Sequence, residues 1–183
     1  MRNLRGGLIL CGLAVAAFSL TTASMSEPGT NDGPAADSLT VGSSNERLVV
    51  FLGSSACPAS TRDSLREDLR ILGDSLQSRL RLSKVRVAMI GVSIDFNVNA
   101  GIRYLRELYP FQEVTVGRGF LNSASTGFVL GASGAALTVP QILILERIVE
   151  IDSTSITVGR SLIVRRIVGA DSIHAWAQKG APM

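Results

Sequence analysis

An apolar run followed by a long amphipathic pattern most limits the folds open to this chain. Residues 47–53, Arg-Leu-Val-Val-Phe-Leu-Gly, are rich in β-formers and typical of a buried strand. After Cys57-Pro58 charged residues fill one helical face and leucines mark the other, at Leu65, Leu69, Leu72, Leu76 and Leu80. A buried strand leading into such a helix predicts a parallel strand–helix–strand unit.

The rest of the chain continues this alternation of strands and helices. We expect a strand over 85–94, a helix over 97–108, a short strand over 113–116, a short helix over 122–130, strands over 141–149 and 161–168, and a closing helix over 170–179. In the helices predicted over 97–108 and 170–179, the inward residues should be Ile102, Leu105, Leu108, Ile173 and Trp176. A polar turn joins the last two strands, so they should be antiparallel. This order predicts an α/β fold with a mixed central sheet and helices on both faces.

The N-terminal 26 residues are typical of a targeting segment. Arg2 and Arg5 precede an apolar run over 6–20 and then small residues, which predicts a signal peptide for export, for example to a bacterial periplasm or cell envelope. No charge intervenes before Glu27, so an uncleaved membrane anchor stays open. Residues 27–45 are polar and read as a flexible linker, and 46–183 as the folded domain. Cys11 belongs to the apolar run, so with the targeting segment removed the mature chain has one cysteine, Cys57.

Charge and histidine content exclude several classes of function. The formal charge is +3, and without Arg2 and Arg5 it falls to +1, from 16 basic and 15 acidic residues. No basic cluster is present, so we expect no nucleic-acid partner. With His174 as the single histidine and no ligand spacing, we expect no metal and no cofactor. His174 is interpreted as a surface or partly buried packing residue, and Asp95 as a residue at a helix N-terminus.

Three segments carry a resemblance to a known family. Residues 48–60, which end in Cys57-Pro58-Ala59-Ser60, resemble the first strand and active-site turn of thioredoxin-like proteins. Residues 139–141, Val-Pro-Gln, resemble the cis-proline loop, and residues 165–170 the last strand and the start of the last helix. The elements between 97 and 130 look like those of envelope thiol:disulfide interchange proteins and redoxins. The resemblance implies a thioredoxin-like three-layer α/β/α fold, with Pro140 in the cis form beside the thiol of Cys57.

The resemblance gives Cys57 the place of the nucleophilic thiol. If Cys57 lies at the N-terminus of the long helix, with Pro58 in its first turn, the helix dipole and free N–H groups should lower the thiol pKa and favour the reactive thiolate. The backbone of Val139 and Pro140 could pair with an extended substrate strand. The candidate site therefore comprises Cys57 and Ser60 as catalytic residues, and Pro58, Val139 and Pro140 for substrate binding.

One departure from the family restricts the chemistry. The second cysteine of the catalytic pattern is replaced by Ser60, so the chain cannot form an intramolecular disulfide at this turn. What remains is monothiol chemistry with protein thiols, protein disulfides or small thiols, or oxidation of Cys57 to a sulfenic acid. As an enzyme, the chain would be a monothiol thiol-disulfide oxidoreductase or an antioxidant-type redoxin. The alternative is a non-catalytic module that presents Cys57 and Pro140 to a protein partner and keeps the thiol as a relic.

Overall fold

The computed structural model describes residues 42–81, 85–130 and 137–182 of the 183-residue chain. The predicted targeting segment, Cys11 and residues 27–41 of the predicted linker lie outside the described residues. Within the described ranges, no helix combines the length and apolar character needed to cross a membrane.

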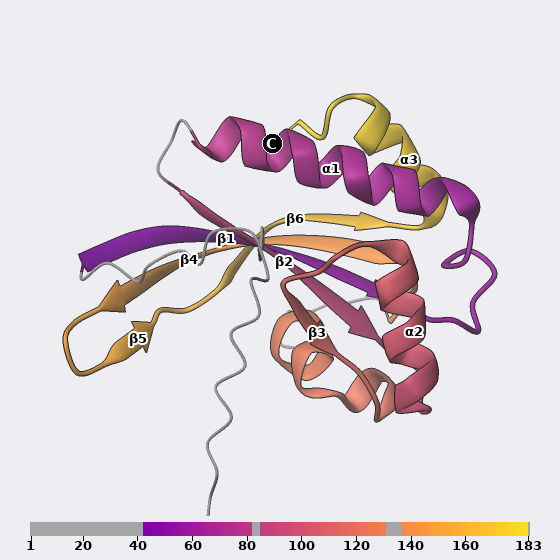
Figure 1. The fold of residues 1–183 in the computed structure, drawn as a ribbon, viewed down its shortest axis with the longest axis horizontal. Helices are drawn as coiled ribbons and strands as arrows, with labels where there is room; N and C mark the ends of the chain where they lie inside the picture. Colours follow the sequence, from indigo (N-terminus) through magenta and orange to yellow (C-terminus); the bar gives the residue numbers. More distant parts are fainter. Residues whose placement is uncertain (1–41, 82–84, 131–136, 183) are drawn as a thin grey trace, which may run out of the picture. The chain divides into compact units, whose positions relative to one another are not determined.

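A mixed β-sheet forms the centre of the domain (Figure 1). Its strands are β1 (Gly42–Gly53), β2 (Arg86–Ser93), β3 (Glu113–Thr115), β4 (Gln141–Ile151), β5 (Ile156–Val158) and β6 (Leu162–Val168). The order is β3-β2-β1-β4-β5, and β6 also pairs with β4. β1, β2 and β3 are parallel, whereas β4 runs antiparallel to β1 and to both later strands. The predicted mixed sheet is confirmed, including the antiparallel pair at the end of the chain.

Helices cover the sheet on one face and short helical turns on the other. The helices are α1 (Asp63–Arg81), α2 (Val98–Leu108) and α3 (Ala170–Gln178), and α1 and α3 lie side by side (Figure 1). Their buried side chains share one core cluster with β1 and β4. A second cluster packs the opposite face against a 3-10 turn, η1 (Gly119–Leu121), and a π-helical turn, η2 (Ser125–Leu130). These three layers, with their strand order, form a thioredoxin-like α/β/α fold.

The central strand explains why its sequence is apolar without alternation. Val49 and Phe51 belong to the core cluster beneath α1, whereas Leu48 and Leu52 belong to the cluster on the other face. Successive side chains of a strand point to opposite faces, and both faces of β1 are covered. All the side chains from Leu48 to Leu52 are fully buried. The predicted buried strand is confirmed and forms the core of the domain.

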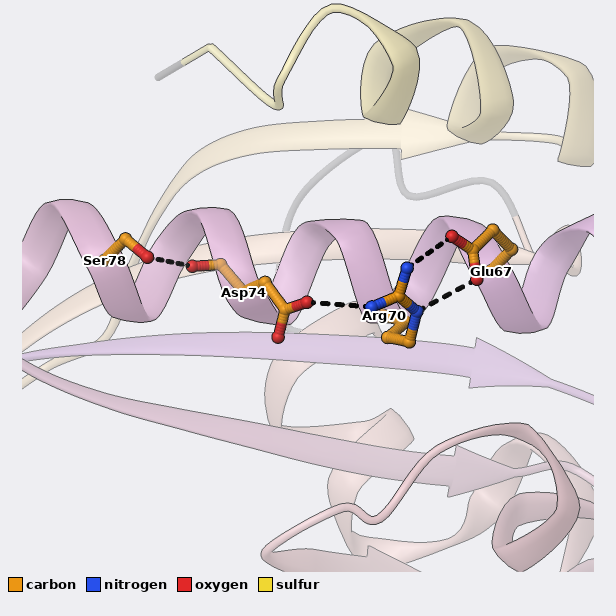
Figure 2. A network of polar contacts seen from close by, with 4 residues as sticks. All are labelled: Glu67, Arg70, Asp74 and Ser78. Atoms are coloured by element: carbon orange, nitrogen blue, oxygen red, sulfur yellow. Dashed lines mark hydrogen bonds and ion pairs between the residues drawn. The ribbon is translucent and has the colours of Figure 1, made fainter.

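Helix α1 separates its two faces as its sequence pattern requires. Leu65, Leu69, Leu72 and Leu76 are at most 1% exposed, whereas the side chain of Leu80 lies outside the described residues. On the solvent face, Figure 2 shows Arg70 between Glu67 and Asp74, one helical turn apart on either side. Ser78 donates a hydrogen bond to the Asp74 carbonyl. Exposed pairs of this kind contribute little to stability, so the leucine face holds the helix on the sheet.

Two strand predictions differ from the structure. β1 begins at Gly42, four residues before the predicted domain start, and Gly42–Asn45 pair with Ile151–Ile148 of β4. These four residues carry no apolar pattern. They form a strand because their backbone pairs with β4. β5 was not predicted at all; it is three residues long and exposed on every residue. Both differences arise from pairing between segments that are distant in sequence.

The helix over 97–108 was predicted correctly in position but not in every inward residue. Asn97 is its N-cap and accepts a hydrogen bond from the Ala100 N–H, so the helix itself starts at Val98. Leu105 and Leu108 are buried as predicted, whereas Ile102 is only half-buried. Tyr104 lies inward as well, at 7% exposure. This tyrosine reaches the loop that carries Cys57.

Candidate functional site

Cys57 lies in the loop that connects β1 to α1. Its side chain is half-buried, and its Sγ donates a hydrogen bond to the carbonyl oxygen of Val139 at 3.6 Å. The Val139–Pro140 peptide bond is cis, as the resemblance implied. Val139 is half-buried and Pro140 buried, directly before β4. The fold thus brings Cys57 to Val139 and Pro140, which lie 82 residues or more further along the sequence.

The predicted position of Cys57 at a helix N-terminus is wrong. Helix α1 begins at Asp63, and residues between Cys57 and Asp63 form turns instead. The Ser60 N–H donates to the Cys57 carbonyl at 2.9 Å, and the Thr61 hydroxyl reaches the same carbonyl at 3.4 Å. Serine and threonine hydroxyls compete with helical hydrogen bonds, and Asp63 supplies the acidic residue that favours a first helical turn. The exposed Pro58 lies in this turn, outside the helix.

The Cys57 thiolate was expected to be stabilised by a helix dipole. In the structure, groups of the turn stabilise it instead. Partial burial raises the pKa of Cys57, because it disfavours the charged form. Hydrogen bonds from the hydroxyl and the N–H of Ser60, and from the Ala59 N–H, outweigh this effect and lower the thiol pKa below its ordinary value. Because the thiolate is the nucleophilic form, this turn favours a reactive Cys57.

Ser60 is a buried polar residue of the turn that follows Cys57. Its side chain is fully buried, and its Oγ has no hydrogen-bond partner within the described residues. An interaction of this hydroxyl with Cys57 lowers the pKa of the thiol.

Tyr104 of α2 holds the far end of the same turn. Its hydroxyl donates to the Ser60 carbonyl at 3.0 Å in a buried position. Burial raises the pKa of Tyr104, and the negative charges of Asp95 and Cys57 raise it further, whereas hydrogen bonds at Ser60 and Ser54 lower it less. The phenol therefore stays protonated and acts as a fixed hydrogen-bond donor.

Asp95 anchors the near end of the loop, a role that the sequence interpretation missed. Its buried carboxylate accepts hydrogen bonds from the Ser54 hydroxyl (2.8 Å), the Ser55 N–H (3.0 Å), the Ser55 hydroxyl (3.0 Å) and the Ser93 hydroxyl (2.6 Å). Burial raises the pKa of Asp95, but these hydrogen bonds outweigh it and hold the pKa below its ordinary value. The carboxylate is therefore ionised and joins the chain leaving β2 to the chain leaving β1.

A sequence signal for this network exists, although it is weak. Ser54 and Ser55 follow one predicted parallel strand, and Ser93 and Asp95 end the next. Since the carboxyl ends of parallel strands meet at one edge of a sheet, polar residues at those ends are candidates for contact. The interpretation of Asp95 as a helix N-terminal residue was wrong, because Asn97 caps α2.

The remaining candidates lie elsewhere. His174 of α3 is exposed and makes a hydrogen bond with Asp68 of α1 through Nδ1 at 2.9 Å, which fits its interpretation as a surface or partly buried packing residue. Among the described residues, no group of three or more His, Cys, Asp or Glu side chains could hold a metal ion. The chemistry available at this site is that of one thiol, with the hydroxyls and N–H groups that surround it.

By sequence, the chain matches no described protein family and no curated protein. Its structure is similar to a thiol-disulfide oxidoreductase from Bacteroides fragilis, with 16% identity and a TM-score of 0.45, over 73% of this chain and 80% of that one. It is also similar to BsSco, a member of the Sco family of cytochrome c oxidase assembly proteins, with 11% identity and a TM-score of 0.32, over 74% and 80% of the two chains. The fold assignment does not depend on these likenesses, because it stands on strand order and connections.

Proposed function

We propose that this chain is an exported thioredoxin-fold protein that carries out monothiol disulfide exchange at Cys57. The observation that carries the proposal is the turn from Cys57 to Ser60, in which two N–H groups and one buried hydroxyl lower the thiol pKa. The half-buried position of Cys57, with its sulfur beside the carbonyl of Val139, supports access to a partner.

The exchange uses one thiol and two steps. The Cys57 thiolate attacks one sulfur of a disulfide in a protein or small molecule, and a new S–S bond forms as the old one breaks. The departing thiolate keeps the bonding electron pair and takes a proton from solvent. A second thiol, from a protein or a small molecule, then attacks the mixed disulfide as its thiolate and releases Cys57 as a thiolate. Because Ser60 cannot resolve the mixed disulfide and Cys57 is the one cysteine of the predicted domain, the second thiol must come from outside that domain.

The N-terminal sequence supports export of this domain. Residues 1–26 would be a signal peptide or a membrane anchor, and the following polar residues a linker to the folded domain. An envelope compartment contains both disulfides and thiols as exchange partners.

The test is the reaction of the full chain, carrying Cys11→Ser, with dithiobis-nitrobenzoate, an aromatic disulfide that releases a coloured thiolate. We expect stoichiometric release, an adduct on Cys57 by mass spectrometry, a faster reaction when the chain is folded than when it is unfolded, and recovery of the free thiol with a small thiol. The Cys57→Ser variant should release nothing. A Ser60→Cys variant should release a second equivalent, because its new thiol can resolve the mixed disulfide.

A folded chain that reacts no faster than the unfolded chain would contradict the proposal. In that case the binding-module alternative is tested with Cys57→Ser in cells. Undiminished cellular function of this variant favours a module that binds partners without thiol chemistry, whereas loss of function favours exchange.

A further inference from the structure

One buried charged group near the thiol has no part in the exchange steps above. The carboxylate of Asp95 lies at the end of β2 and is 8% exposed. It contacts three serines, two of which precede Cys57 in the loop after β1. A buried carboxylate is costly unless it is fully hydrogen-bonded, so its retention beside the thiol needs an explanation.

The contacts lead from Asp95 to Cys57 in a short chain. The Ser54 hydroxyl donates to Asp95, and the same Oγ accepts the Ala56 N–H at 3.2 Å. The Ser54 carbonyl accepts the Cys57 N–H at 3.2 Å. Asp95 thereby fixes Ser54, and Ser54 fixes the two residues through which the chain enters the turn.

The strands behind this loop are fixed as well. The Ile94 N–H donates to the Gly53 carbonyl at 3.0 Å, and Ser93 pairs with Gly53 in the register of β1 and β2. Asp95 therefore extends the pairing of the two strands beyond their ends into the loop. On the other side of Cys57, the hydroxyl of Tyr104 holds the carbonyl of Ser60. The turn is held at both ends by side chains from outside it.

We propose that Asp95 is a positioning residue for Cys57: its carboxylate fixes the chain that enters the turn, and so keeps the sulfur within reach of the N–H groups that follow it. This inference rests on the proposed exchange at Cys57 and gives that site a component that does not touch the substrate.

A purely electrostatic role for Asp95 would have the opposite effect on the thiol. The titratable side chains in this cluster are Cys57, Asp95 and Tyr104, and the charges of Asp95 and Cys57 both act on Tyr104. A nearby negative charge disfavours a thiolate, so removal of the charge alone would shift the titration of Cys57 to lower pH. Removal of an anchor that positions the thiolate should shift the titration to higher pH, because the N–H groups and the thiolate no longer align.

The variant Asp95→Asn separates these two effects. Its size is unchanged, but its side chain has one acceptor oxygen in place of two, so the groups that now donate to one of the two carboxylate oxygens lose their acceptor. The matched control is Asp152→Asn, which removes a carboxylate that also accepts four hydrogen bonds, in the exposed turn between β4 and β5. All variants carry Cys11→Ser, and thiolate formation is followed by ultraviolet absorbance against pH in the folded, full-length chain.

We expect the titration midpoint of Cys57 to move to higher pH in Asp95→Asn and to stay unchanged in Asp152→Asn. Alkylation by iodoacetamide near neutral pH should slow by about threefold to tenfold in Asp95→Asn, as the thiolate fraction falls. An unchanged midpoint, or one that moves to lower pH, would overturn the proposal.

A second variant covers the case in which Asp95→Asn does not fold. Ser54→Ala removes the hydroxyl that links Asp95 to the Ala56 N–H and leaves the other contacts of the carboxylate in place. Its midpoint should move in the same direction by a smaller amount, and an unchanged or lower midpoint in this variant also contradicts the proposal. Absorbance titration needs no exchange partner. Failure of disulfide exchange in the unsubstituted chain is therefore distinguishable from failure of the positioning role.

Discussion

Two loops of this domain are each organised by one aspartate, and they differ in what that aspartate connects. Asp152 accepts four hydrogen bonds from Thr154 and Ser155, its near neighbours in the turn between β4 and β5. Asp95 also accepts four, but three come from Ser54 and Ser55, about 40 residues away in the sequence. Asp152 is exposed and Asp95 is buried. The same number of hydrogen bonds closes a local turn in one case and joins two strands beside a thiol in the other.

This difference indicates which loop the fold depends on. A local turn forms its hydrogen bonds as soon as a few residues come together, and water can replace them when the turn opens. A buried network forms only when β1 and β2 are already paired, and it cannot be replaced by water without opening the domain. The Asp95 loop is therefore coupled to global folding more strongly than the Asp152 turn is.

The largest expected effect is on the free energy of unfolding. Asp95→Asn should lower it by about 2–4 kcal/mol, because a buried network loses its charged acceptor. Asp152→Asn should lower it by a smaller amount, because its hydrogen bonds lie in an exposed turn where water can replace them. Urea denaturation followed by circular dichroism measures both values, and equal losses in the two variants would remove the distinction between the loops.

The second effect concerns the other anchor of the Cys57 turn. Tyr104→Phe should lower the free energy of unfolding by about 1–2 kcal/mol, because the buried Ser60 carbonyl loses its donor. The control is Tyr109→Phe, which removes a hydroxyl from a half-buried ring. If the two variants lose the same amount in urea denaturation, the bond from Tyr104 to Ser60 adds nothing specific to this turn.

A smaller effect is expected in acid. The pKa of Asp95 lies below its ordinary value, and four hydrogen bonds in the β4–β5 turn lower the pKa of Asp152 to about 2. A carboxyl whose pKa is depressed in the folded state stabilises the fold above its unfolded-state pKa, and this stabilisation is lost as pH falls through the folded-state pKa. Unfolding should therefore become easier as pH drops below the ordinary Asp value of 3.8. The free energy of unfolding should depend less steeply on pH in Asp95→Asn. An identical dependence in that variant would show that the pKa of Asp95 does not lie below its ordinary value in the folded chain. Carboxyl titration by NMR measures both sites directly.

The smallest effect is expected at Ser60. Ser60→Ala removes the buried hydroxyl that lowers the pKa of Cys57 but leaves both N–H groups in place. Alkylation of Cys57 near neutral pH should slow by about twofold to fivefold, because the thiolate loses the stabilisation that one hydroxyl gives it. Ser64→Ala is the control, because Ser64 is an exposed residue in the first turn of α1. A rate in Ser60→Ala equal to that of the control would exclude a role for the hydroxyl.

The strands and helices of the core could be predicted because their patterns are local. The leucines of α1 and the apolar run of β1 record in sequence which faces are buried. Cys57 and Val139 could be placed together only through the resemblance, since nothing local connects residues 82 positions apart.

What could not be predicted depends on tertiary pairing. The polar start of β1 becomes a strand because β4 lies beside it, and the exposed β5 has too few residues for a pattern. The start of α1 at Asp63 was missed because hydroxyls and N–H groups between Cys57 and Thr61 bond locally instead of continuing the helix. Asp95 was missed because its partners come from two different strand ends.

The account as a whole depends on one property, a thiol pKa for Cys57 that lies below the ordinary value in the folded chain. The most direct measurement is the ultraviolet absorbance of the thiolate against pH in the Cys11→Ser chain, folded and then unfolded in urea. The account predicts a midpoint at lower pH in the folded chain, because the Cys57 to Ser60 turn stabilises the thiolate more than burial disfavours it. A folded midpoint equal to the unfolded one, or higher, would contradict it.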